Sequence, residues 1–431
     1  MIEKILDKVS RNVDSAEVFA VETSNMDVTF ESGKLKNAEY KGISGIALRV
    51  IKNGRIGFSS STDPERFNEM VEHACASSKF GKKVEFEFPC QLPAEEIITF
   101  DPAIESFTPQ KAVEEGQKAV HELLGSVPKG LTDVHISAST GNVRIANTSG
   151  LDISYRVSGF DHAVTSVIID GDSILWIGDG GSYGTLDIRT DEYIKKISGL
   201  AKMAKKKAPR SSGKMPVIFT AQEMPNILQS IELGVDGKRL LKGDSPLIGR
   251  EGENILGRIT ITDDPFKKGA PASRPYDDEG VPSRRNVLFE NGQFKSFLFD
   301  LDTAQKTGNV TTASAERGSL STPSIGISNL VMSPGNSSLD EMIADIAEGV
   351  IVYGVLGGGQ SNLLAGDFAL NIMLGFLVSG GEIKGRLIDT MVSGNVYSAF
   401  KSVVSMGSQL HEVGSLFIPD VLFPELSISG R

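Results

Sequence analysis

The sequence predicts an α+β fold in two parts, an N-terminal domain of antiparallel strands with helices followed by a β-rich C-terminal domain. Three observations lead to this prediction. The chain has 431 residues, more than the roughly 250–300 at which a single hydrophobic core stops growing. Short apolar runs separated by turn signals recur through both halves. A Lys-, Pro-, Ser- and Gly-rich stretch at 204–214 divides them, so we expect domains at 1–207 and 215–431 joined by a linker at 208–214.

The N-terminal domain is expected to combine antiparallel strands with several helices. Apolar residues at helical spacing predict a first helix within 1–13. The strand-like runs of 16–61 then predict a meander in which Asn53-Gly54 forms a type I′ hairpin turn. The remaining elements are predicted as helices at 63–80 and 109–125, strands between 133 and 178, and a closing helix at 191–208.

One helix of the C-terminal domain is well specified by its sequence, FTAQEMPNILQSIELGVDG. Thr220 and Glu223 have the spacing of a capping box, and Gly234 is placed to end the helix. Between them, four apolar residues repeat at helical spacing and predict one buried face: Met224, Ile227, Leu228 and Ile231. The rest of this domain reads mostly as strands, with hairpin turns at Asn291-Gly292 and Gly380-Gly381 and a further helix at 338–349.

Composition and charge exclude several classes of protein. No apolar run approaches the ~18 residues that a membrane-spanning helix needs, and the first 13 residues lack the apolar core of a signal peptide, so we expect a cytoplasmic protein. Cys75 and Cys90 are too few for a disulfide framework or a thiolate zinc site. The net charge of −11 argues against binding nucleic acid.

Two stretches could contact a ligand. The run Gly357-Gly358-Gly359-Gln360 lies among strand-like segments, where glycine marks a bulge, a close approach of backbones or a bound peptide; a phosphate loop is disfavoured because no Lys-Ser/Thr follows. The pair Asp277-Asp278 reads either as part of a turn or as a site for a cation or a peptide amine. No two histidines have the i, i+4 spacing of metal ligands, and no G-x-S-x-G elbow occurs.

Several longer stretches resemble the TldD/PmbA family. They are DDEGVPSRRNVLFENGQFKSFLFD, AQKTGN and VLGGGQSNLLAGDFALNIMLGFLVSGGEI, together with the N-terminal AEVFAVETSNMDVTFESGKLKNAEYKGISGIALRVIKNGRIGFSSS. The resemblance therefore extends over essentially the whole chain. It implies an N-terminal α+β domain followed by a β-rich domain, in agreement with the elements predicted above.

The resemblance also implies a particular branch of that family. Members of the TldD type carry a zinc motif H-E-x-x-x-H on a helix after the domain boundary and a cysteine ligand near the C-terminus. Here the corresponding helix holds Gln229 and Glu232, no histidine occurs between 163 and 410, and no cysteine follows Cys90. The chain is therefore expected to be a TldE/PmbA-type member without catalytic or metal-ligating residues, and Glu232 is expected to lie on the helix surface.

Three hypotheses about function follow. The leading one, from the resemblance, is a zinc-less subunit of a two-component metallopeptidase that acts on unstructured peptides, with zinc in a TldD-type partner subunit. In that role Asp277, Asp278 and the run from Gly357 to Gln360 are candidate contacts with substrate or partner. The alternative is a non-proteolytic regulatory or binding protein, similar to a gyrase modulator. A third is a hydrolase built from Asp277, Asp278 and His411. A homodimer of the chain in isolation is left open.

Overall fold

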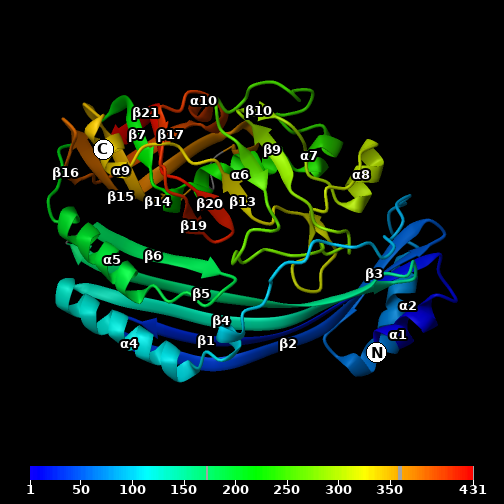
Figure 1. The fold of residues 1–431 in the computed structure, drawn as a ribbon. Coiled ribbons are helices and arrows are strands. Elements are labelled where there is room, and N and C mark those ends of the chain that lie inside the picture. The colour runs from blue at the N-terminus through cyan, green and yellow to red at the C-terminus, as the bar shows by residue number, and fades with distance from the viewer. Residues whose placement is uncertain (171–172, 358–361, 431) are drawn as a thin grey trace.

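A long antiparallel sheet from the first half of the chain is the largest element in Figure 1, a view of the computed structural model, which describes residues 1–170, 173–357 and 362–430. Its six strands run in the order β3-β2-β1-β4-β5-β6 and every neighbouring pair is antiparallel. The β2–β3 turn places Asn53 at φ 51° and Gly54 at φ 66°, which confirms the predicted type I′ hairpin. The strands are β1 (Ser15–Glu31), β2 (Lys34–Lys52), β3 (Arg55–Ser61), β4 (Gly130–Asn147), β5 (Asp152–Asp170) and β6 (Ser173–Tyr183).

Helices cover this sheet at its two ends (Figure 1). At one end α1 (Ile2–Val9) and α2 (Phe67–Ser77) pack on β1 and β2 through a small apolar cluster. At the other end α3 (Pro102–Glu105), α4 (Pro109–Ser126) and α5 (Thr190–Ala204) bury apolar residues against β4, β5 and β6. The start of α4 is set by its sequence, because the side chain of Thr108 accepts a hydrogen bond from the N–H of Lys111 at 3.4 Å and Pro109 follows it. Among residues 1–170, 173–357 and 362–430, no helix is both long enough and apolar enough to cross a bilayer.

The second half of the chain contributes two more large sheets. A seven-stranded sheet has the order β14-β7-β21-β17-β15-β16, with β18 pairing with β21, and a six-stranded sheet has the order β10-β9-β8-β13-β20-β19. The first comprises β7 (Gly213–Phe219), β14 (Glu348–Gly357), β15 (Asp367–Ser379), β16 (Glu382–Arg386), β17 (Thr390–Asn395), β18 (Ser405–Met406) and β21 (Val421–Gly430). The second comprises β8 (Ile261–Asp263), β9 (Asn286–Glu290), β10 (Gln293–Phe294), β13 (Leu330–Met332), β19 (His411–Val413) and β20 (Leu416–Ile418).

Short helices and turns connect these strands. The predicted turn Asn291-Gly292 joins β9 to β10 with both residues at positive φ, and Gly380-Gly381 joins β15 to β16 in the same way. The chain combines helices with several separate sheets, which confirms the α+β prediction. The short helices are α6 (Pro225–Gly234), α7 (Gly237–Lys242), α8 (Leu301–Thr307), α9 (Leu339–Ala344) and α10 (Val396–Lys401), with 3-10 turns at Pro64–Arg66, Ala221–Glu223 and Leu363–Ala365 and a two-stranded pair formed by β11 (Ala315–Glu316) and β12 (Ser324–Ile325).

One hydrophobic cluster joins the two halves of the chain. It combines residues of α4, α5 and the N-terminal sheet with Ile351 of β14 and with Leu374 and Phe376 of β15. Beside it, the N–H of Ala208 donates to the carbonyl of Arg386 at 2.8 Å. The C-terminal half is thereby held over the N-terminal sheet, as Figure 1 shows. The division at 208–214 stays a prediction.

His162 on β5 is buried in this shared core without a polar partner. Its side chain is fully inaccessible, its ring lies 5.0 Å from that of Tyr193, and neither ring nitrogen has a hydrogen-bond partner among the residues that the structure describes. Burial lowers the pKa of His162 to about 4, although the carboxylate of Asp187 opposes this shift. The imidazole is therefore neutral at neutral pH.

We expect His162 to make the fold sensitive to acid. Its pKa is lower in the folded chain than the ~6.5 of an unfolded one, so the unfolded state binds the extra proton and stability falls as pH drops from ~6.5 to about 4. The loss is expected to reach about 3 kcal/mol, from ~1.4 kcal/mol per pKa unit. His162→Phe should remove this part of the profile, as measured by urea unfolding at a series of pH values.

The comparison isolates His162 from other buried groups. Burial raises the pKa values of Asp277 and Glu223 to about 7, so both groups also make stability depend on pH. They do so equally in the native chain and in His162→Phe, and the difference between the two stability profiles therefore reports on His162. The exposed His121 on α4 supplies the control, since His121→Gln should keep the native profile. If the free energy of unfolding falls by the same amount with decreasing pH in the native chain and in His162→Phe, the expectation is contradicted.

Candidate functional site

The candidate site is built on the segment that the sequence singles out after the domain boundary. It forms a 3-10 turn at Ala221–Glu223 and then α6, with Ile227, Leu228 and Ile231 buried as predicted. The predicted capping box is wrong. The hydroxyl of Thr220 donates to the carbonyl of Val352 at 3.0 Å, and the carboxylate of Glu223 accepts a hydrogen bond from the N–H of Val355. Both side chains of the predicted box therefore contact β14 and do not cap the helix.

Glu223 and Asp420 complete the attachment of this segment. The carboxylate of Glu223 accepts a hydrogen bond from the N–H of Val355 at 3.0 Å, and that of Asp420 accepts one from the N–H of Ala221 at 2.8 Å. Burial raises the pKa of Glu223 to about 7, against the opposing effect of that backbone hydrogen bond. The hydrogen bonds to β14 and to Asp420, which lies just before β21, therefore fix the start of the segment that carries α6.

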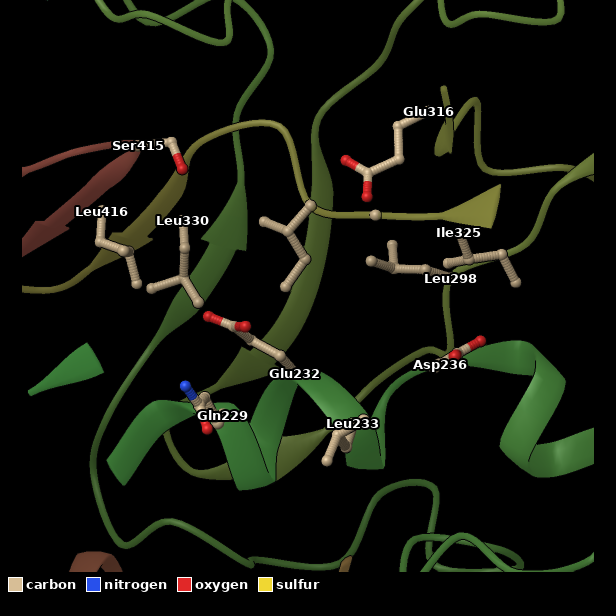
Figure 2. Close-up of a pocket in the computed structure, with 12 residues that line it drawn as sticks. Gln229, Glu232, Leu233, Asp236, Leu298, Glu316, Ile325, Leu330, Ser415 and Leu416 are labelled. Carbon is tan, nitrogen blue, oxygen red and sulfur yellow. The ribbon is translucent and has the colours of Figure 1, made fainter. Parts of the chain in front are cut away.

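A cavity lies against the more exposed face of α6. Its volume is about 460 Å³, within the range of small-molecule and side-chain pockets. Figure 2 shows Glu232 rising from α6 and Glu316 entering from the opposite wall, with their carboxylates directed into the space between. Twelve residues line it: Gln229, Glu232, Leu233, Asp236, Leu298, Glu316, Ile325, Gly326, Ile327, Leu330, Ser415 and Leu416.

Glu232 lies inside this cavity rather than on an open helix surface, so that expectation was wrong. Its side chain is half-buried, and its carboxylate accepts no hydrogen bond and forms no ion pair within the described part of the chain. Burial raises the pKa of Glu232, and the nearby charge of Glu316 adds to the shift. The carboxyl is consequently easier to protonate than one in water.

The other two acidic residues of the cavity differ in their contacts. Burial also raises the pKa values of Glu316 and Asp236. Asp236 accepts a hydrogen bond from the N–H of Lys238 at 2.8 Å and so caps α7. Glu316 lies over Gly326, where an added Cβ would fall 2.0 Å from its carboxyl carbon. Glycine at 326 is therefore required for the carboxyl group of Glu316 to occupy this position.

The cavity residues do not fit a zinc ion. Their donors are carboxylate, amide and hydroxyl oxygens, whereas protein zinc sites mainly use imidazole nitrogen and thiolate sulfur. Within residues 1–170, 173–357 and 362–430, no three His, Cys, Asp or Glu side chains converge well enough to hold a metal ion. The three residues of the third hypothesis, Asp277, Asp278 and His411, lie within these ranges and do not form such a group. His411 lies on β19, with its Nε2 3.7 Å from a carboxylate oxygen of Asp420.

Asp277 and Asp278 lie outside this cavity, in a loop that crosses between the two halves of the chain. The carboxylate of Asp277 is fully buried and accepts hydrogen bonds from the N–H groups of Glu279, Val281 and Ala315 at 2.9–3.1 Å. Asp278 accepts one from the N–H of Arg317 at 2.6 Å. Both side chains support the loop, and a contact of either with substrate or partner stays a prediction.

The glycine run is only partly described. Gly357 ends β14 opposite Leu370 of β15, with a φ of 113° that side chains disfavour. Gly358, Gly359 and Gln360 lie outside the described residues, so their predicted contact with a peptide or partner remains a prediction. The antiparallel pairing of β14 with β15 agrees with the interpretation of this region as strands.

A buried ionic network beside Asp277 was not anticipated from the sequence. Arg49 of β2 pairs with Glu17 of β1 at 2.6 Å and with Glu279 at 2.7 Å, and Arg317 pairs with Glu17 as well. Arg49 is 3% exposed and both carboxylates are inaccessible. No local pattern could have revealed the network, because Arg49 and Glu279 are 230 residues apart in the chain.

Three family models match the chain in succession. They are described as PmbA/TldA metallopeptidase domain 1 over residues 16–78, the central domain over 91–211 and the C-terminal domain over 212–430. A metalloprotease of Methanothermobacter thermautotrophicus is 29% identical, covering 94% of this chain and 90% of the relative.

Two solved structures share the fold. TldE from Thermococcus kodakarensis has a TM-score of 0.92 with 24% identity and covers 100% of both chains. A putative modulator of a DNA gyrase from Thermotoga maritima has a TM-score of 0.91, also with 24% identity and full coverage of both chains.

Proposed function

Because the chain belongs to the PmbA/TldD metallopeptidase family, we propose that it is a zinc-less TldE/PmbA-type subunit of a two-component peptidase acting on unstructured peptides. In this role it forms part of the substrate chamber, and a TldD-type partner subunit supplies the zinc. The observation that carries the proposal is the cavity on α6, which offers only oxygen donors.

The chemistry of the cavity supports a role in binding rather than bond cleavage. Zinc peptidases use the metal to polarise the scissile carbonyl and to activate water, and no imidazole or thiolate is present in this cavity to hold it. Leu233, Leu298 and Leu330 supply apolar walls, and Gln229 supplies an amide that can pair with a peptide group. These apolar and amide side chains can orient a peptide in the cavity.

Unstructured peptides are the substrates that this role favours. A folded protein would first have to open locally before a segment could enter a chamber between two subunits. We also propose that the complex works in the cytoplasm, because Cys75 and Cys90 are both free thiols.

We expect cleavage of a flexible peptide only when this chain is mixed with its zinc-bearing partner. The assay compares this chain, the partner and their mixture, each with and without a chelator, and metal analysis accompanies each sample. This chain alone should bind no stoichiometric zinc and cleave nothing, whereas the mixture should cleave in a chelator-sensitive way.

The other outcomes are equally informative. Chelator-resistant cleavage that follows this chain through successive columns would overturn the proposal. If the mixture cleaves no faster than the partner alone, the chain is not a working subunit. That result would favour the alternative, a non-proteolytic regulatory or binding protein; the Thermotoga structure of this fold is described as a putative modulator of a DNA gyrase.

A further inference from the structure

We propose that Asn53 is a site of spontaneous deamidation, at which the folded chain slowly converts asparagine to aspartate or isoaspartate. The dipeptide Asn-Gly is the one that hinders this reaction least, because glycine has no side chain beside the reacting nitrogen. It occurs twice in the sequence, at Asn53-Gly54 and at Asn291-Gly292, and both form hairpin turns with positive φ at each residue. The structure leaves the first turn open to the reaction and locks the second.

The reaction needs only the asparagine side chain, the next backbone nitrogen and water. The glycine nitrogen attacks the side-chain amide carbon and forms a cyclic imide. The side-chain amide nitrogen leaves as ammonia, which takes up the proton that the glycine nitrogen loses. Water then adds to one of the two imide carbonyls and breaks its C–N bond, which gives aspartate or isoaspartate. The rate therefore depends on how easily the glycine nitrogen leaves its own hydrogen bond and turns toward the side chain.

The turn at Asn53-Gly54 leaves the glycine nitrogen available. The N–H of Gly54 donates at 3.0 Å to a carboxylate oxygen of Asp14, whose side chain is exposed and can rotate away. The carbonyl of Gly54 accepts a hydrogen bond from the N–H of Val84 at 3.0 Å. A Cβ added to Gly54 would meet no atom within 4 Å beyond its two chain neighbours. The backbone of this turn therefore has room to rotate.

The turn at Asn291-Gly292 is held by a neighbouring loop. The N–H of Gly292, a buried residue, donates to the carbonyl of Ile259 at 2.7 Å. The side-chain amide of Asn254 donates to the carbonyl of Asn291 at 3.1 Å. A Cβ added to Gly292 would fall 2.1 Å from the carbonyl oxygen of Gly257. The nitrogen must therefore break a backbone hydrogen bond, in a turn without free space, before it can attack.

Deamidation of Asn53 weakens the contacts at this end of the N-terminal sheet, where Figure 1 shows β3 beside α1 and α2. Either product adds a negative charge to the turn whose glycine N–H binds the carboxylate of Asp14. Isoaspartate also lengthens the backbone by a methylene group, which moves Gly54 away from Asp14 and Val84. The amides of Gly54 and Val84 should therefore exchange their hydrogens faster in the modified chain.

Peptide mapping by mass spectrometry tests the proposal on the full chain. Folded samples and samples unfolded in guanidinium chloride are incubated in warm, mildly alkaline buffer, and the conversion of amide to acid is followed at both turns. In the folded chain we expect Asn53 to react about tenfold faster than Asn291, because only the second turn must first break a backbone hydrogen bond. Unfolding should bring the two rates together.

Three outcomes would overturn the proposal. They are equal rates in the folded chain, faster reaction at Asn291, and a difference that persists unchanged after unfolding, which would mean that the neighbouring sequence and not the fold sets the rates. The assay needs neither a peptide substrate nor a zinc-bearing partner, so its result does not depend on the proposed function.

Asn53→Gln is the matched control for the structural effect. Glutamine keeps the side-chain amide but must form a larger and slower ring, so the variant should stay unmodified at 53 while Asn291 reacts at its native rate. Hydrogen exchange at Gly54 and Val84 should then become faster on incubation of the native chain and stay constant in the variant. Unchanged exchange in a native sample whose Asn53 has been converted would overturn the effect assigned to these contacts.

Discussion

Arg49→Met is expected to destabilise the folded chain by about 3–5 kcal/mol, the usual cost of removing one partner from a buried ion pair. The guanidinium of Arg49 is the bridge between Glu17 on the N-terminal sheet and Glu279 in the C-terminal half. Without it Glu17 keeps its pairing with Arg317, whereas Glu279 retains, among the residues that the structure describes, only the hydrogen bond from the N–H of Leu301 at 2.8 Å. Urea unfolding at neutral pH measures the loss.

Two further variants test the cause. Arg49→Met combined with Glu279→Gln should recover part of the lost stability, because no buried carboxylate is then left without its cation. The exposed pair of Arg66 with Glu69 at 2.5 Å serves as the matched control, and Arg66→Met should change the stability far less than Arg49→Met, because water already screens an exposed ion pair. Similar losses for Arg49→Met and Arg66→Met would show that the buried network does not hold the two halves together.

Phe423→Ala is expected to cost about 3–5 kcal/mol through loss of burial and the cavity it leaves. Phe423 on β21 is fully buried, and its ring centroid lies 6.0 Å from that of Phe219 and 5.3 Å from that of Phe400. The same cluster buries Leu228 and Ile231 of α6, so the substitution should also loosen the helix that lines the candidate cavity.

The control for this prediction is Phe80→Ala. Phe80 is 91% exposed, and its removal should change the unfolding midpoint little. Hydrogen exchange of the α6 amides in Phe423→Ala provides a second readout, with faster exchange expected there than in the native chain. Native stability together with native exchange on α6 would contradict the packing assigned to Phe423.

Features that depend on neighbouring residues were predictable from the sequence. Asn53-Gly54 and Asn291-Gly292 form the expected turns, because a tight turn needs residues that tolerate positive φ whatever surrounds them. The buried face of α6 was predictable for a similar reason, since helical periodicity places Ile227, Leu228 and Ile231 on one side before any tertiary contact exists.

Features that depend on distant residues were not predictable in this way. The spacing of Thr220 and Glu223 allows a capping box, yet β14 offers both side chains other partners. Glu232 has the sequence context of a surface helix residue, and only the wall carrying Glu316 encloses it in a cavity.

The amino-acid sequence alone is enough to predict the α+β class, the hairpin turns and the apolar face of α6, and to show that histidine and cysteine are missing where a zinc motif would lie. Each of these follows from local chemistry or from residue identity alone. Only the folded chain brings Arg49 to Glu279 and encloses Glu232 in a cavity. Those features arise because folding brings together residues that are far apart in the chain, and the stability of each contact depends on burial that no local pattern encodes.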